Sequence, residues 1–382
     1  MNILFIYDSP MNPEKGGTER STSLVMDELE KRGHKCLGFL HFNQDNPQEY
    51  FYNNVRVPCL LEFLTNHHID VVVNQIAFHQ WLLKAFLDNG GREWKSRGGK
   101  IISFMHFDPS DVPFNITNLF RDFGKKNLYA KVKRIGLLFY LPFLLKRMRK
   151  ERHLSFRYIY EESDKYILMS KAFIPIFCKK AGIEYNEKLH VITNMLTFPT
   201  IQHKSILDTK DKRVIVVARL DEKQKKISTI LKVWHQLKDH HTYILQIIGS
   251  GKDEQFYKDL VRKMGIKDVE FCGQQSPLDY YLKARIFLMS SPAEGWGLTI
   301  TESMQNGVVP IVMNTSVVFQ DIIDHKQNGF LAGSINEFRE YLNKLLIHDT
   351  ERRKIALNAL NKVSQFCSSK VGDDWDNLLK QL

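Results

Sequence analysis

A glycine-containing stretch between an apolar run and a helical pattern has the composition of an anion-binding turn. Over residues 290–299 it reads SSPAEGWGLT. Gly295 and Gly297 allow a ligand to approach the backbone closely. The N–H groups of Leu298 and Thr299 then lie unpaired at the start of the expected helix, where a negative charge is favoured. This pattern is suited to binding a diphosphate.

Two glutamates flank the turn. Glu302 lies about one turn into the expected helix, where its carboxylate can accept hydrogen bonds from a ribose diol. Glu294 lies in the preceding loop, on the side where a sugar attached to the diphosphate would project. The alternative is that both are ordinary loop and surface acids, because two glutamates eight residues apart are common by chance.

A second group of charged residues follows the apolar run 214–218. Arg219 comes directly after this run, at the end of an expected strand where open α/β sheets bind ligands. Its guanidinium can bind phosphate oxygens in a bidentate way, and Lys225 can add a charge that stabilises a leaving nucleoside diphosphate. The alternative is a solvated lysine-rich loop, and this is the interpretation we give to Lys223 and Lys226.

The N-terminal part of the chain holds two further candidates. Gly16 and Gly17 form an expected tight turn before a helix, which can meet a phosphate or a sugar. The turn lacks the spacing G-x-G-x-x-G, so a dehydrogenase is disfavoured. His106 follows another apolar run, but a lone histidine is more often structural, and the residues alone leave both interpretations open.

The elements that must position these residues alternate between strands and helices. Eight apolar runs predict buried parallel strands, at residues 3–7, 71–74, 101–105, 166–169, 214–218, 244–248, 286–289 and 309–313. Helical patterns separate them, among them residues 21–32, 80–89, 228–238, 254–264 and 335–346. The alternation predicts right-handed βαβ units and an α/β fold.

The length of 382 residues predicts two domains, because a domain usually takes ~100 to 200 residues. A polar stretch with a proline interrupts the pattern at residues 197–213, so we expect domains at 1–200 and 201–365. The tail, 366–382, places Trp375, Leu378 and Leu379 on one helical face, which needs another surface to cover it.

Composition excludes several classes of protein. Apolar residues make up 43% and charged residues 25%, as in globular proteins and unlike disordered or fibrous chains. The five cysteines are far apart and lack C-x-x-C spacing, which suggests neither a disulfide framework nor a zinc cluster and fits a reducing cytosol. We expect no signal peptide and no membrane span, because the longest apolar run has ten residues and a span needs ~20.

Most of the net charge of +11 lies in one basic segment, residues 121–157, which carries twelve Lys and Arg against two acids. Interleaved apolar residues predict a basic amphipathic helix pair broken near Pro142. Docking on an anionic membrane surface is one interpretation, and a solvated helix hairpin packed on the first domain is the other. We expect no nucleic-acid partner, because no recognised binding fold or aromatic platform accompanies the charge.

These residues resemble a known family. The segment from Glu294 to Glu302 resembles the E-x7-E motif of retaining glycosyltransferases of family 4, and Arg219 with Lys225 resembles their diphosphate-binding pair. Gly16 and Gly17 resemble their N-terminal glycine loop. The resemblance covers nearly the whole chain and implies the GT-B fold, in which two Rossmann-like domains face each other across a cleft and the final helix returns to the first domain.

The resemblance also implies roles for the candidates. Glu302 would bind the ribose, Glu294 the hydroxyls of the donor sugar, and His106 the reacting region of that sugar. The chain departs from the family at Ala218, where glycine is common, and at Lys226, where Gly or Asn usually follows the lysine. These departures leave open whether Lys225 or Lys226 binds phosphate.

We therefore predict a glycosyltransferase that moves a sugar, with retention of configuration, from a UDP- or GDP-sugar to a hydroxyl of a saccharide or lipid-linked acceptor. The resemblance implies no metal ion and no other cofactor. We expect a cytoplasmic protein of cell-surface polysaccharide or glycolipid synthesis, peripheral on the inner face of the membrane if the basic segment docks there. A nucleotide-sugar epimerase of the same fold, and a noncatalytic nucleotide-sugar-binding or membrane scaffold protein, remain the alternatives.

Overall fold

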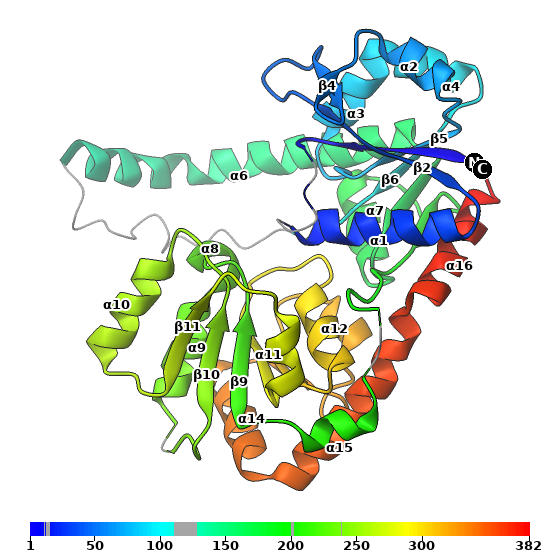
Figure 1. The fold of residues 1–382 in the computed structure, drawn as a ribbon. Coiled ribbons are helices and arrows are strands. Elements are labelled where there is room, and N and C mark those ends of the chain that lie inside the picture. The colour runs from blue at the N-terminus through cyan, green and yellow to red at the C-terminus, as the bar shows by residue number, and fades with distance from the viewer. Residues whose placement is uncertain (11, 13–15, 111–127, 200–201, 238) are drawn as a thin grey trace. The chain divides into compact units, whose positions relative to one another are not determined.

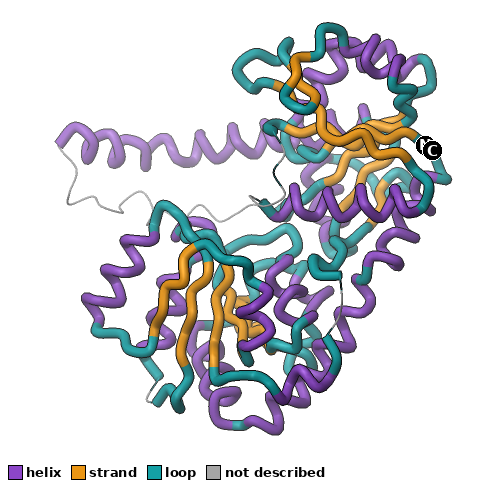
Figure 2. Tube along the Cα trace, in the orientation of Figure 1, coloured by secondary structure: helices purple, strands orange, loops and turns teal. Residues whose placement is uncertain are grey.

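The computed structural model describes residues 1–10, 12, 16–110, 128–199, 202–237 and 239–382. The chain divides into two compact units. The first comprises Met1–Ile192 and Trp375–Leu382, and the second comprises Thr193–Asp374. Each unit has one sheet with helices packed against it, as predicted for an α/β chain (Figures 1 and 2).

The first unit has a sheet in the order β4-β3-β2-β1-β5-β6-β7-β8. Its strands are β1 (Asn2–Tyr7), β2 (Lys35–Phe42), β3 (Tyr50–Tyr52), β4 (Val55–Arg56), β5 (Val71–Asn74), β6 (Lys100–Phe104), β7 (Lys165–Leu168) and β8 (Leu189–Val191). All pairs are parallel except those that β3 forms with β2 and β4. The central strands are largely apolar because helices cover both faces of a parallel sheet, although Asn74 on β5 and Ser103 on β6 are buried polar residues.

The helices of the first unit are α1 (Gly17–Lys31), α2 (Leu60–Asn66), α3 (Gln80–Phe86), α4 (Arg92–Ser96), α6 (Leu128–Glu162) and α7 (Phe173–Ala181). The first helix begins at Gly17, four residues before the predicted start. Gly16 is its N-cap, and a side chain there would collide with the carboxylate of Glu19. The two glycines are therefore the start of the helix and not a turn that precedes it.

The predicted helix pair broken near Pro142 is wrong. Helix α6 runs through Pro142 as one element of 35 residues (Figure 1). Proline removes only one backbone hydrogen bond, and the leucines, lysines and arginines around it favour helix strongly enough to continue it. Residues 121–127 of the predicted segment lie outside the described residues. None of the helices in the described part of the chain has a stretch long and apolar enough to span a membrane.

The second unit has an all-parallel sheet in the order β11-β10-β9-β12-β13-β14. Its strands are β9 (Arg213–Val217), β10 (Ile244–Ile248), β11 (Val269–Gly273), β12 (Ile286–Met289), β13 (Val309–Met313) and β14 (Phe330–Ala332). Its helices are α8 (Glu222–Lys225), α9 (Ile227–His235), α10 (Glu254–Met264), α11 (Leu278–Lys283), α12 (Leu298–Gln305), α13 (Phe319–Ile322), α14 (Ile335–Ile347) and α15 (Asp349–Val363).

Helix α9 shows how apolar spacing builds the core of the second unit. Ile227, Ile230, Leu231 and Trp234 recur at helical spacing and are all buried in the main core of this unit. Complete burial of such a side chain contributes ~1.5 to 3 kcal/mol. The central strands are therefore firmly held, and the loops at their carboxyl ends start from fixed positions.

The last helix, α16 (Ser368–Leu379), carries the predicted apolar face. Trp375, Leu378 and Leu379 are each 1% exposed. The ring of Trp375 lies 5.7 Å from that of Phe104 on β6, and Asp376 Oδ1 lies 2.9 Å from Nε2 of His34. The end of the chain is thus part of the first unit.

Candidate active site

The strand order of the second sheet reverses beside β9. The chain passes from β9 to β10 and β11 on one side and returns to β12 on the other side. Open α/β sheets bind ligands at the carboxyl ends of the two strands that flank such a reversal. Six of the predicted donor-site residues follow these two strands, β9 and β12: Arg219, Lys225, Glu294, Gly297, Leu298 and Thr299. Glu302, the remaining one in this unit, lies within α12, as do Leu298 and Thr299.

The loop after β9 presents Arg219 on the surface. Asp221 caps α8 by accepting hydrogen bonds from the backbone N–H groups of Lys223 and Gln224. Burial would raise the pKa of Asp221, but its hydrogen bonds with Lys252 and with these N–H groups lower the pKa instead. Asp221 therefore stays ionised and fixes the loop that carries Arg219.

Lys226, one departure from the pattern of the family that the chain resembles, has an unusual backbone conformation. It has φ of 48° and ψ of 41°, a left-handed conformation between α8 and α9. Gly and Asn adopt this conformation most readily, which is a physical reason for their frequency at this position in the family. The side chain of Lys225, in contrast, reaches toward the loop after β12.

Lys225 and Glu294 form an ion pair across the reversal point. Lys225 Nζ lies 2.5 Å from Glu294 Oε1, and the two side chains are 24% and 16% exposed. Ser290, at the end of β12, donates to the backbone carbonyls of Lys225 and Lys226 and so joins the same two loops. The structure thus brings together the predicted phosphate-binding lysine and the predicted sugar-binding glutamate.

Helix α12 begins directly after the glycine turn. Gly297 is its N-cap with φ of 95°, so a side chain at this position would be strained, and the helix starts at Leu298 as predicted. Glu302 is 1% exposed, and its Oε2 accepts a hydrogen bond of 3.0 Å from the hydroxyl of Tyr281 on α11. A hydrogen bond from a fixed phenol holds this carboxylate in one orientation.

Gly249 and Gly251 follow β10, and the sequence analysis did not single them out. A side chain at Gly249 would lie 2.1 Å from the carbonyl oxygen of Ala218, and one at Gly251 would lie 2.5 Å from that of Leu220. These glycines let the loop after β10 pack directly on the loop that carries Arg219. The repeat G-S-G at a strand end was the available signal.

The first sheet reverses its order between β1 and β5. Gly16 and Gly17 lie at the start of α1, the helix that follows β1, whereas Gln75 comes directly after β5. His106 comes two residues after β6, the next strand. The first unit therefore has its own group of candidates at the carboxyl edge of its sheet.

His106 is a buried histidine in contact with a glutamine. It is 7% exposed, and its Nε2 lies 2.5 Å from Gln75 Oε1. Its ring lies 4.0 Å from that of Phe104. Burial lowers the pKa of His106 to about 3, so the ring is neutral near pH 7. A neutral imidazole can form hydrogen bonds with sugar hydroxyls but does not offer a positive charge.

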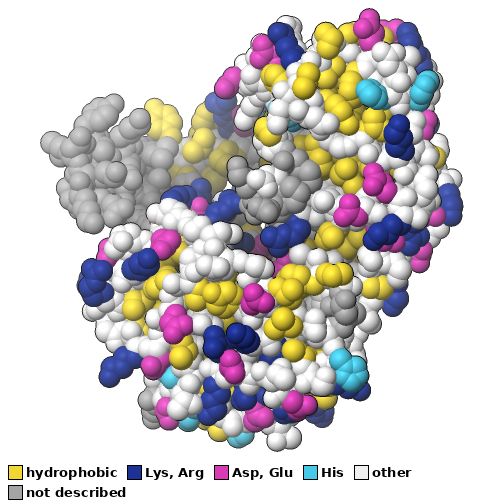
Figure 3. All heavy atoms as spheres, viewed as in Figure 1, with side chains coloured by type: hydrophobic (Ala, Val, Ile, Leu, Met, Phe, Trp, Pro, Cys, Tyr) yellow, Lys and Arg dark blue, Asp and Glu magenta, His cyan; other side chains and the backbone are white. Residues whose placement is uncertain are grey.

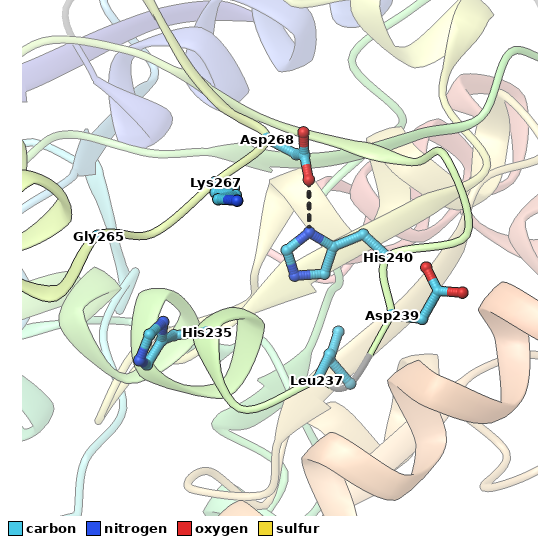
Figure 4. A pocket seen from close by; sticks show the side chains of 7 residues that line it. All are labelled: His235, Leu237, Asp239, His240, Gly265, Lys267 and Asp268. Carbon is cyan, nitrogen blue, oxygen red and sulfur yellow. Dashed lines mark hydrogen bonds and ion pairs between the residues drawn. The ribbon is translucent and has the colours of Figure 1, made fainter.

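Two pockets of the described residues contain none of the predicted site residues. One, of about 370 Å³, lies where α9 ends and beside residues 265–268 (Figure 4). Both ring nitrogens of His240 are engaged: Nδ1 lies 2.8 Å from Asp268 Oδ2, and Nε2 lies 3.0 Å from the carbonyl of Trp234. The other, of about 290 Å³, lies between α1 and β2. No group of three or more His, Cys, Asp or Glu in the described residues is arranged to hold a metal ion.

Comparison with known proteins finds a family match within the second unit. Residues 197–362 match the family described as glycosyl transferases group 1. An uncharacterized glycosyltransferase of Haemophilus influenzae is 30% identical over 156 residues, which are 39% of this chain and 44% of that protein. A GDP-Man:Man(3)GlcNAc(2)-PP-Dol alpha-1,2-mannosyltransferase of Dictyostelium discoideum is 28% identical over 148 residues, 36% of this chain and 29% of that protein. The matched region is less than half the length of each of these relatives.

A solved structure extends the likeness to both units. The crystal structure of Anabaena HepE in complex with UDP has a TM-score of 0.70 and 16% identity, and the match covers 100% of both chains. The chain has the GT-B fold of two Rossmann-like domains, as the resemblance implied. The group 1 match lies in the second unit, whereas the likeness of fold covers both units.

Proposed function

We propose that the protein is a retaining glycosyltransferase that transfers a sugar from a nucleoside diphosphate donor to an acceptor hydroxyl. The observation that supports this most directly is the ion pair of Lys225 with Glu294, which lies beside Arg219 at the strand reversal of a group 1 domain. Cationic groups for a diphosphate and a carboxylate for a sugar meet at one place.

Each residue has a role in this proposal. Arg219 binds diphosphate oxygens and stabilises the charge that grows on the leaving group, and Lys225 assists once the diphosphate displaces Glu294 from it. Glu294 then turns to the hydroxyls of the sugar. The N–H groups of Leu298 and Thr299 face the diphosphate at the start of α12, after Gly297. Glu302 accepts hydrogen bonds from the ribose.

The first unit contributes the acceptor side in this proposal. His106, neutral and buried, contacts the reacting region of the donor sugar. Gly16 and Gly17 allow donor or acceptor to approach the start of α1 closely. The acceptor is a saccharide or lipid-linked saccharide, and the product belongs to cell-surface polysaccharide or glycolipid synthesis.

A thermal-shift panel of UDP, GDP and their sugars tests the donor. HepE binds UDP and the Dictyostelium relative is named for GDP-Man, so both bases belong in the panel. A ligand at ~100 times its dissociation constant adds ~2.7 kcal/mol to the free energy of unfolding. No shift with any nucleotide would contradict the proposal. The anomeric configuration of the product, read by proton NMR, then tests retention.

The same panel separates the alternatives. A nucleotide-sugar epimerase would change the donor sugar without an acceptor, whereas a transferase needs an added acceptor for a glycosidic product. A noncatalytic binding protein would show the thermal shift without turnover of any donor.

Exposed side chains on residues 140–150 of α6 support a peripheral membrane location. Tyr140 and Phe143 are each 69% exposed and Met148 is 44% exposed (Figure 3 shows hydrophobic side chains on α6 beside the grey atoms). At ~100° per residue, these three fall within an arc of about 140°, which also holds the exposed ion pair of Arg147 with Glu151, and the exposed Lys146, Arg149 and Lys150 fall within the neighbouring arc. We propose that this part of α6 lies on an anionic membrane surface.

Vesicle sedimentation tests this location. Changing Lys146, Arg147, Arg149 and Lys150 to Gln is expected to weaken binding to anionic vesicles by up to ~4 kcal/mol, at ~1 kcal/mol per charge. A matched control changes four exposed lysines elsewhere on the first unit, Lys31, Lys35, Lys84 and Lys171. If neither the parent nor the variants bind anionic vesicles at low salt, α6 is a solvated helix and the membrane proposal fails.

A further inference from the structure

Gln75 lies at the strand reversal of the first sheet, where it is 1% exposed. Its backbone N–H donates to the carbonyl of Ile6 on β1, over 3.1 Å. The position of Gln75 is therefore fixed by the two central strands of the unit.

The side-chain oxygen of Gln75 connects two elements of the candidate site. Its Oε1 lies 3.0 Å from the hydroxyl of Thr22 on α1, whose single proton is shared with the carbonyl of Thr18 at 2.8 Å, and it lies 2.5 Å from His106 Nε2. An amide oxygen has two lone pairs and can accept both hydrogen bonds. Gln75 thus joins the helix that begins at the glycine pair to the histidine after β6.

This contact determines where His106 carries its proton. An amide oxygen can only accept, so His106 Nε2 must donate. The neutral ring has a single N–H, and Nδ1 is then left with a lone pair. Nδ1 is buried and has no hydrogen-bond partner among the described residues. A buried acceptor without a donor is costly unless a ligand supplies one.

We propose that Gln75 is a positioning residue that holds His106 in the Nε2–H tautomer, so that Nδ1 accepts a hydrogen bond from a hydroxyl of the donor sugar. This inference rests on the proposed function for the identity of the ligand. In this proposal Nδ1 of His106 is a hydrogen-bond acceptor. The sugar hydroxyl is the hydrogen-bond donor that Nδ1 lacks in the ligand-free protein.

Nitrogen NMR of the ligand-free protein tests the tautomer without any turnover. In protein labelled with ¹⁵N-histidine, the His106 signals are identified by their loss in His106→Asn. The expected pattern is a protonated Nε2 and an unprotonated Nδ1 at pH 7. A proton on Nδ1 would mean that the amide of Gln75 is reversed and donates, and this result would overturn the proposal.

Three variants separate positioning from a structural role. Gln75→Leu removes the acceptor at nearly constant volume and is expected to produce a mixture of tautomers. Thr22→Val removes the hydroxyl that contacts Gln75 and the carbonyl of Thr18, and is expected to retain the Nε2–H tautomer. Gln246→Leu is the matched control, because Gln246 is a buried strand glutamine of the second unit with partners of its own.

Kinetics with UDP-glucose complete the test. Gln75→Leu is expected to lower kcat about tenfold and to leave KM within about twofold, because the imidazole of His106 would be misplaced in a step that follows binding. Thr22→Val and Gln246→Leu are expected to keep kcat within about threefold of the parent. An unchanged kcat in Gln75→Leu would overturn the positioning role. If the parent protein does not turn over UDP-glucose at all, UDP-glucose is not its donor substrate. The NMR result still decides the tautomer of His106.

Discussion

The strand reversals of the two sheets carry opposite kinds of chemistry. In the second unit, the loops after β9 and β12 hold Arg219, Lys225 and Glu294, all of which water can reach. In the first unit, Thr22, Gln75 and His106 are 2%, 1% and 7% exposed and form an uncharged chain of contacts.

Burial explains the difference. A charged group keeps its charge at modest cost where water reaches it, whereas burial favours the neutral form of a histidine. A nucleotide-sugar also contains both kinds of group, because its diphosphate is charged and its sugar ring is uncharged. In the proposed function, the charged reversal of the second unit suits a diphosphate, and the neutral reversal of the first unit suits an uncharged sugar hydroxyl.

Arg219→Ala is the strongest test of the ionic half of this comparison. Loss of one group that stabilises developing charge lowers kcat by ~10²- to 10³-fold. We expect such a loss with a much smaller change in donor affinity, because the charge that Arg219 meets is greatest in the transition state. Steady-state kinetics and nucleotide titration measure both quantities.

Arg213→Ala is the matched control, since Arg213 lies at the opposite end of the same strand. It is expected to keep kcat near that of the parent. If Arg219→Ala changes only KM, the role in the transition state is excluded.

Glu302→Gln tests the buried carboxylate of the second unit. A hydrogen bond to a charged group contributes ~1.5 to 3 kcal/mol, so UDP or GDP is expected to bind more weakly by this amount. The amide still offers an oxygen to Tyr281, which limits damage to the fold. Calorimetric titration measures the change, and unchanged affinity would remove the ribose role.

Much of the fold was predictable because most residues of the buried parallel strands are apolar. Each of the eight predicted strands is present with its ends within one residue of the prediction. β2 was missed because Lys35, Gly38 and His41 interrupt its apolar run, and the register shifts beside Gly38. β8 and β14 have three residues each, too few to show a pattern.

The candidate site was predictable only where its residues are close in sequence. Glu294 and Glu302 share one segment with the glycine turn, so the glycines and the preceding apolar run singled them out. Gln75 lies 31 residues from His106, and Tyr281 lies 21 residues from Glu302. A lone glutamine or tyrosine carries no sequence signal, and only the neighbouring strands and helices bring these partners together.

The pH dependence of stability tests the neutral half of the comparison. His106 has a pKa lowered by burial from 6.5 to about 3. Between these values the unfolded chain binds a proton that the folded chain does not, so this group stabilises the fold fully above pH 6.5 and progressively less as the pH falls toward 3. The slope approaches ~1.4 kcal/mol per pH unit.

His106→Asn removes this titration and is expected to lose stability less steeply than the parent between pH 6 and 4. Denaturant unfolding at several pH values gives the difference between the two proteins. Parallel curves would mean that His106 is protonated as easily in the folded chain as in the unfolded chain, and the neutral character of the first reversal would be lost.

The smallest expected effect concerns the ion pair of Lys225 with Glu294. A pair that water reaches usually contributes ~0.2 to 1 kcal/mol, even at short distance. A double-mutant cycle with Lys225→Met and Glu294→Gln, followed by denaturant unfolding without ligand, is expected to give a coupling free energy in this range. Because so little stability is at stake, the pair can open to admit a diphosphate, and Glu294→Gln is expected to lose turnover while it keeps the fold. A coupling free energy of several kcal/mol would instead mean that the pair holds the two loops together as a structural element. A diphosphate could then not readily displace Glu294 from Lys225.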